Sequence, residues 1–461
     1  MTTEATGRRG GSGQGSTDPM PAAERVLELV RARASDAEAE ITVERGTAAL
    51  TRFANSFIHQ NVAEETSHLT LRVAIEGRTA TARLDGPADG ETLARLVDGA
   101  LESARIRPVD PDWPGVAPAA AAPDIEHWDE ATAAAAPDDR ARLVADFVAA
   151  AGGLETAGAC STSETIVAFA NSGGQRLTGR TTRASLDGIA RTGSSDGSGR
   201  WSSVAIADLD GHLVGERAAR KARESRNATD LEPGRYEVVL EAQCVANMLQ
   251  FLFIYGFNGR AVEEDRSFVR LGEPQFDGSI TLSDDVTDPA TVGLAFDAEG
   301  TPKRRTTVVD NGITSAVLHT RRTARNAGTE STGSAVEDGD QAGALPNNPA
   351  IAPGDLSDDE LIGGVSRGVL VTDFWYVRIL DPKSQVVTGL TRNGVWLVQD
   401  GQIVRPVSNL RFTQSYLEAL GPGAVRGIGR QRALIPGAFD GVHLVPSIHL
   451  ASWNFTGGAK G

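Results

Sequence analysis

Apolar and polar residues along the first hundred positions alternate in patterns that predict two helices around a set of strands. Pro21–Ala34 and Gly90–Ile106 carry apolar residues at helical spacing. Between them lie β-rich runs, and Ile75-Glu-Gly-Arg has the glycine-containing signature of a hairpin. We therefore expect an N-terminal α/β unit with an antiparallel sheet over residues 21–107. Its expected strands are 40–45, 49–54, 68–76 and 79–84.

A second unit follows a Pro- and Ala-rich stretch at 107–123, which is typical of a boundary. Residues 138–151 have helical spacing, and residues 214–228 form either another helix or a charged linker. These features predict a small middle α+β domain over 122–228. Its expected strands are 156–163, 166–171, 178–189 and 201–208.

The remainder, residues 232–461, is predicted to be mostly β, with one apolar helix after the β-rich run Tyr236–Leu240. Asp310-Asn-Gly312 and Asp400-Gly401 each separate two β-branched runs and predict hairpin turns. Residues 326–360 are polar and rich in Gly, Asp and Pro, so we expect a long surface loop there. Together the three units predict an α+β fold.

The apolar helix, Cys244 to Phe257, is too short to cross a bilayer. At about 1.5 Å per residue it spans roughly 21 Å, against a hydrocarbon core of about 30 Å. Asn247 and Gln250 also interrupt it. Because it is apolar around most of its circumference, we expect it to be buried in the C-terminal domain.

The composition of the chain disfavours some classes of function and favours one location. The formal net charge is −16, which disfavours binding to nucleic acid or to an anionic membrane. The first twenty residues, rich in Gly, Ser and Thr, lack the apolar core of a signal peptide and predict a disordered tail. Cys160 and Cys244 make no disulfide framework. These features favour a cytoplasmic protein.

Several ordered motifs in the C-terminal half resemble those of the TldD/PmbA family. They are Phe296-Asp-Ala-Glu-Gly300, Gly368-Val-Leu-Val-Thr372 and the segment from Thr388 to Val407, which contains Arg392-Asn-Gly394 and ends in Pro-Val. The resemblance covers about residues 20–455 and is strongest from 290 to 410. It implies a metallopeptidase-family protein, and a DNA-binding role is disfavoured despite the family's historical label as a gyrase modulator.

Active members of this family carry His-Glu-x-x-x-His on the apolar helix and bind zinc there. Here the matching residues read Gln250-Phe-Leu-Phe-Ile-Tyr255, so Gln250, Phe251 and Tyr255 replace both histidines and the glutamate. A catalytic zinc needs three protein ligands and a general base, which these side chains do not supply. The family's C-terminal cysteine is also missing from 437–446. The resemblance thus implies a chain without metal, its zinc being held by a partner.

The resemblance further implies a TldE/PmbA-like subunit that pairs with a TldD-like catalytic subunit to degrade unfolded or short peptides in a central chamber. Candidate substrate contacts are Arg392 and Asn393, with Asp440 and His443 where the family's cysteine is expected. One alternative is a homodimeric peptide-binding protein without catalysis. Another is a peptidase whose metal has moved to Asp440, His443 and His449.

The sequence gives little support to a serine or a cysteine nucleophile. Gly193-Ser-Ser-Asp-Gly197 matches Gly-x-Ser-x-Gly, but a nucleophile elbow joins a strand to a helix, and a strand is expected at Trp201. Cys244 would act as a nucleophile only if it were exposed beside a histidine, whereas its helix is expected to be buried.

Overall fold

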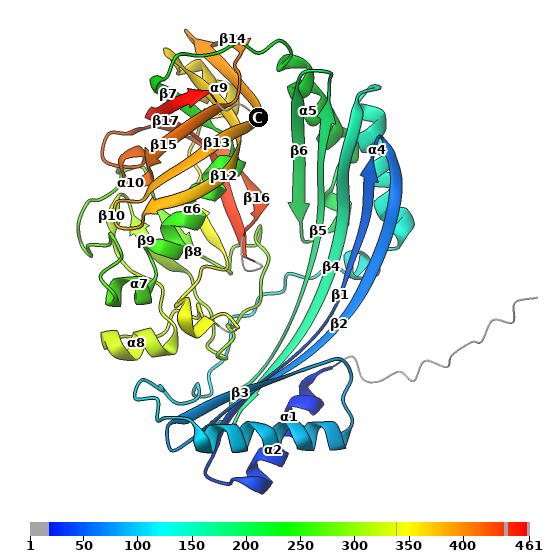
Figure 1. The fold of residues 1–461 in the computed structure, drawn as a ribbon, viewed down its shortest axis with the longest axis vertical. Helices are drawn as coiled ribbons and strands as arrows, with labels where there is room; N and C mark the ends of the chain where they lie inside the picture. Colours follow the sequence, from blue (N-terminus) through cyan, green and yellow to red (C-terminus); the bar gives the residue numbers. More distant parts are fainter. Residues whose placement is uncertain (1–17, 338, 438–440, 459–461) are drawn as a thin grey trace, which may run out of the picture.

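The computed structural model describes residues 18–337, 339–437 and 441–458. Figure 1 shows two parts: a long, curved antiparallel sheet, and a C-terminal lobe of strands and short helices beside it. The fold class is α+β, as predicted. No helix within the described residues is both long and apolar enough to cross a bilayer.

The N-terminal segment forms half of the long sheet and covers one of its ends. Two predicted strands, 40–45 and 49–54, are one continuous strand, and the strand after it starts earlier than predicted. Every residue from 57 to 65 is exposed, so that stretch carries no alternating pattern. The elements are α1 (Met20–Arg33), β1 (Glu38–Ala54), β2 (Phe57–Ile75), β3 (Arg78–Asp85) and α2 (Gly90–Ile106).

Helices α1 and α2 bury one apolar face of this sheet. In α2 the Asp89 carboxylate caps the first turn by accepting from the Thr92 amide, and apolar residues recur at helical spacing behind it. They pack with Ile41 and Val43 of β1. The alternating positions of β1, Glu40 and Thr42, therefore lie on the opposite face of the sheet.

The middle segment completes the same sheet. Strand β1 pairs with the first middle strand along its length, which gives the order β3-β2-β1-β4-β5-β6. One sheet thus runs through the first two predicted domains, whose boundary stays a prediction. The alternative between helix and linker at 214–228 resolves as a helix. The elements are α3 (Glu130–Ala133), α4 (Pro137–Ala150), β4 (Glu155–Asn171), β5 (Arg176–Arg191), β6 (Asp196–Ser203), η1 (Ile206–Asp208) and α5 (Gly211–Glu224).

The C-terminal lobe is built on a second, mixed sheet of eleven strands. Both predicted hairpin turns are present, between β9 and β10 and between β13 and β14. The elements are β7 (Gly234–Leu240), α6 (Ala242–Tyr255), α7 (Gly259–Glu263), β8 (Leu282–Asp284), β9 (Thr306–Asp310), β10 (Ile313–Thr314), α8 (Arg321–Ala327), η2 (Gly339–Gln341), β11 (Pro349–Ile351), α9 (Asp358–Gly363), β12 (Arg367–Asp381), β13 (Val386–Gln399), β14 (Gln402–Pro406), β15 (Leu410–Ser415), α10 (Tyr416–Ala419), β16 (Val425–Pro436) and β17 (Val442–Gly458).

The prediction of a surface loop over 326–360 is wrong for much of that stretch. Ser334, Ala344 and Ile351 are fully buried, and Leu345 is nearly so. The Leu345 amide donates to the Ser334 carbonyl at 2.9 Å, so the chain folds back on itself there. Small polar residues suggested solvent because their packing partners come from distant parts of the chain.

Candidate functional site

Helix α6 carries the three positions where active relatives are expected to hold zinc. It packs against β12 and β17, and it buries Leu249, Leu252 and Phe253. Gln250 and Tyr255 are half-buried and Phe251 is 9% exposed. The prediction of a buried apolar helix is therefore correct for most of its surface.

Aromatic rings occupy the space beside these positions. The rings of Phe251 and Tyr255 stack with their centroids 5.8 Å apart, and Phe251 meets Tyr416 edge-on at 6.1 Å. The Tyr416 hydroxyl donates to Asn247 Oδ1 at 2.9 Å, which ties α10 to α6. The result is a packed apolar contact with neutral hydrogen bonds at its edge.

This arrangement does not fit a zinc ion. Zinc takes thiolate, imidazole or carboxylate ligands, and none of these occurs at positions 250, 251 or 255. Within the part of the chain that the structure describes, no three His, Cys, Asp or Glu side chains gather as a metal site. That the protein holds no zinc in solution stays a prediction, based on this ligand chemistry.

Two alternative nucleophiles have unsuitable surroundings. Cys244 is fully buried on α6, with Sγ 3.7 Å from the Val371 carbonyl, and burial raises the pKa of this thiol well above its usual value. Gly193–Gly197 lies at the hairpin between β5 and β6 and is followed by no helix there. Neither residue set has the geometry of an activated nucleophile.

Arg392 and Asn393, predicted substrate contacts, lie on β13 where the C-terminal lobe meets β6. The Arg392 guanidinium lies over the Trp375 ring, 4.3 Å from its centroid. The Asn393 amide donates to Asp373 Oδ2 at 3.0 Å, and Arg200 of β6 donates to the same oxygen at 2.8 Å. Asp373 thus holds the two parts of the molecule together.

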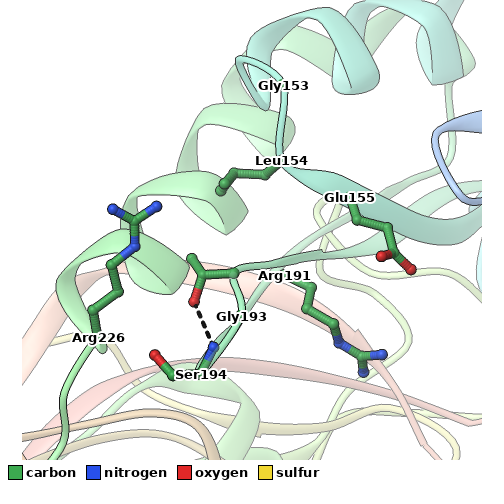
Figure 2. Close-up of a pocket in the computed structure, with 8 residues that line it drawn as sticks. Gly153, Leu154, Glu155, Arg191, Gly193, Ser194 and Arg226 are labelled. Carbon is green, nitrogen blue, oxygen red and sulfur yellow. Dashed lines mark hydrogen bonds between the residues drawn. The ribbon is translucent and has the colours of Figure 1, made fainter.

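These two residues line a crevice of about 480 Å³ with the β5–β6 turn and the chain after α5. A neighbouring hollow of about 400 Å³ shares that turn; in Figure 2, Arg191 and Arg226 lie on either side of Ser194. Hydroxyl, amide and guanidinium groups dominate both surfaces. Such groups can bind polar parts of a peptide, and the Asp196 carboxylate in this lining is paired with Arg191 at 2.7 Å. Substrate binding at Arg392 and Asn393 stays a prediction.

The remaining predicted residues do not assemble into a metal site. His443 and His449 are six residues apart on β17, or about 20 Å along an extended strand, so they cannot share one ion. Burial lowers the pKa of His443 to about 4. His449 Nε2 lies 3.1 Å from Glu237 Oε2. Asp440 lies outside the described residues.

Sequence reasoning missed a third hollow, a cavity of about 520 Å³ between the long sheet and the C-terminal lobe. The motif Phe296–Glu299 forms part of its wall, opposite Glu40, Thr42 and Glu44 of β1. The available signal was the regular placement of polar residues at alternate positions of β1, beside apolar Ile41 and Val43. That alternation predicts a strand, and it does not show which part of the molecule faces its polar side.

Comparison with known proteins matches three family models in order along the chain. They describe the PmbA/TldA metallopeptidase domain 1 over residues 39–104, the central domain over 119–226 and the C-terminal domain over 233–457.

Among curated relatives, a metalloprotease of Methanothermobacter thermautotrophicus is 30% identical over 280 residues, which cover 56% of this chain and 59% of that protein. A Buchnera aphidicola protein named metalloprotease TldD homolog is 24% identical over 44% of this chain and 43% of its own. The chain thus spans less than two thirds of the length of these relatives.

Two solved structures share the fold. TldE from Thermococcus kodakarensis superposes with a TM-score of 0.85 at 19% identity, over 94% of this chain and 100% of that one. A Thermotoga maritima protein described as a putative modulator of a DNA gyrase superposes with a TM-score of 0.82 at 18% identity, over the same shares. With the three matched domains, these findings establish that the chain belongs to the PmbA/TldD metallopeptidase family.

Proposed function

We propose that this protein is a metal-free, TldE/PmbA-like subunit of a TldD-type zinc metallopeptidase acting on unfolded or short peptides. A TldD-like partner supplies the zinc and the general base, and this chain supplies chamber wall and peptide contacts. The proposed location is the cytoplasm. Binding to nucleic acid or to a membrane forms no part of the proposal.

One observation carries this proposal: the stacked pair of Phe251 and Tyr255 at the family's metal-binding positions. An aromatic contact packed against Tyr416 stabilises the helix by excluding water, whereas a catalytic zinc requires an open position for water. In this chain the helix therefore contributes to packing, and in active relatives it is expected to bind the catalytic zinc.

The crevice at Arg392 and Asn393 supports a role in holding peptide. Its polar groups are fixed by neighbours, since Arg392 is held on Trp375 and Asn393 on Asp373. Preorganised groups lose little entropy on binding. A homodimer that binds peptides without cleaving them would use the same features, and it is the alternative.

Mixing this chain with a TldD-like protein that contains His-Glu-x-x-x-His distinguishes the proposed subunit from the homodimeric peptide-binding protein. Light scattering after size exclusion should show a homodimer for this chain alone and a heterodimer for the mixture. Cleavage of an unstructured peptide should require the heterodimer, and a partner whose motif glutamate is replaced by glutamine should form the complex without activity. A partner that is fully active alone, unchanged in mass and rate by this chain, contradicts the proposal.

A metal assay tests the chain by itself. The purified protein should retain well under one zinc per chain after dialysis. The combined variant Gln250→His, Phe251→Glu and Tyr255→His should still cleave no peptide, because the last ligand and the groups that orient the ligands are missing. Stoichiometric zinc in the unmodified protein that survives dialysis would refute the metal-free assignment.

A further inference from the structure

The cavity between the long sheet and the C-terminal lobe has walls of two kinds. Its polar wall is the outward face of the sheet, where Glu40 of β1 lies opposite Arg72 of β2 in the strand register. The same face also carries Val167 of β4, and the other wall includes apolar Leu294 and Phe296. A volume of about 520 Å³ is within the range of small-molecule sites.

Glu40 is buried in this cavity without a hydrogen bond. The residue is 7% exposed, and it forms an ion pair with Arg72, whose Nη1 lies 3.6 Å from Glu40 Oε1. Within the described residues no donor reaches its carboxylate. Burial raises the pKa of Glu40 to about 8. A buried carboxyl group in this state has unused capacity to accept hydrogen bonds.

Asp297, in the same cavity, shows what a structural carboxylate looks like. It accepts from the backbone amides of Glu299, Thr301 and Ala335 at 2.9–3.0 Å, and it fixes the turn of the Phe296–Gly300 motif. All its hydrogen bonds are therefore explained by the fold. Glu40, by contrast, accepts no hydrogen bond from a described residue and has only its ion pair with Arg72.

Lys303 is a group of opposite sign to Glu40 in the same cavity. It lines the cavity as a half-buried side chain, and burial lowers the pKa of its ammonium group. Asp284 and Asp297 act on it only through space, and no described residue forms a hydrogen bond or an ion pair with it. The cavity wall thus carries a carboxyl group, ion-paired with Arg72, and an ammonium group, and neither forms a hydrogen bond with a described residue.

A metal ion would not interact favourably with both the Glu40 carboxyl group and the Lys303 ammonium group. The described carboxylates of this region do not gather as a metal site, and a cation would leave Lys303 without a partner. A ligand that carries one charge of each sign satisfies both groups at once. Free amino acids and short peptides have this property, since they end in an ammonium and a carboxylate.

We propose that this cavity binds a free amino acid or a short peptide as a zwitterion. Glu40 and the neighbouring Glu299 hold the ammonium, Lys303 holds the carboxylate, and the apolar wall at Leu294 and Phe296 takes the side chain. This deepens the proposed function, on whose peptide-handling role it rests, by naming the ends of the peptide as the recognised groups.

Calorimetry on the full chain at pH 7 tests the proposal with glycine, Ala-Ala and Ala-Ala-Ala as probes. At least one should bind, with saturation at one site per chain. Acetylating its amine or amidating its carboxylate should each weaken binding at least tenfold. Because Glu40 is mostly protonated in the free protein, binding should also release protons, seen as a heat that depends on the buffer.

Variants assign the two ends of the ligand. In Lys303→Met, amidation of the probe should no longer weaken binding, and in Glu40→Gln, acetylation should no longer do so. Lys383→Met, which changes an exposed lysine paired with Asp265, is the control and should bind like the unmodified protein.

Failure of all three probes to bind overturns the proposal, as does binding that is indifferent to both end modifications. The proposed subunit function fails separately. If the heterodimer is active but this chain binds none of the probes, the zwitterion proposal is refuted and the subunit function stands. If this chain binds the probes but changes neither the mass nor the rate of its partner, the subunit function is refuted and the zwitterion proposal stands.

Discussion

Helix α6 and the cavity between the two parts of the molecule differ in the contacts that their side chains make. At α6, Phe251, Tyr255 and Tyr416 pack ring on ring, where a family member with zinc would need ligands and water. In the cavity, Glu40 and Lys303 form no hydrogen bond with a described residue, and burial shifts the pKa of each toward its neutral form. One region is closed by packing, and the other is a cavity whose wall carries ionisable groups of both signs.

Substitutions in the two regions should therefore have different effects. A packed aromatic contact contributes stability and tolerates no charge, so changes there should act on folding. Unsatisfied buried groups cost stability, and a protein that retains them gains if a ligand completes their interactions. Changes at the cavity should therefore act on binding and on pH dependence.

The largest effect is expected at α6. Phe251→Glu places a carboxylate among the rings of Tyr255 and Tyr416 and should lower the free energy of unfolding by about 5 kcal/mol. Urea denaturation followed by circular dichroism measures it. Phe57→Glu, at a phenylalanine that is 57% exposed on β2, is the matched control and should change stability by less than about 0.5 kcal/mol. Equal melting of both variants would mean that α6 faces solvent.

The second prediction concerns the cavity and pH. Burial raises the pKa of Glu40 from 4.5 to about 8, so the fold favours the protonated carboxyl group. Its contribution to stability is fully present below pH 4.5 and is lost as the pH rises through 8. Relative to Glu40→Gln, the unmodified protein should lose about 4 kcal/mol over this interval.

Urea midpoints at several pH values measure this slope. Glu28→Gln changes a surface glutamate of α1 that pairs with Arg25, and it should leave the slope unchanged. Parallel pH profiles for Glu40→Gln and the unmodified protein would show that Glu40 is ionised in the fold, and the contrast with α6 would then disappear.

The smallest effect is expected at the crevice. Arg392→Ala removes a cation–π contact with Trp375, which is 49% exposed, and should cost about 0.5–1 kcal/mol of stability. Arg378→Ala, which removes a similar contact with Tyr376, serves as the control for loss of a surface arginine. If Arg392 contacts peptide, only its variant should weaken binding of an unstructured peptide. A loss of more than 2 kcal/mol on Arg392→Ala would instead make it a structural residue.

The sequence predicted the elements with regular patterns and missed those without one. The periodic helices α1 and α2 and the turns at Asn311-Gly312 and Asp400-Gly401 follow from local chemistry, and the structure contains them. The exposed first half of β2 was missed because it has no buried side. The buried stretch around Ser334 and Leu345 resembled a loop because its small residues pack against distant segments.

Three properties follow from the sequence alone: the α+β class, the family resemblance, and the lack of zinc ligands at Gln250, Phe251 and Tyr255. These depend on residue identity and short-range spacing. The pairing of β1 with β4 in one sheet and the placing of Glu40 and Lys303 in one cavity follow from the tertiary structure alone. Distances between residues far apart in the chain depend on packing, which no local pattern contains.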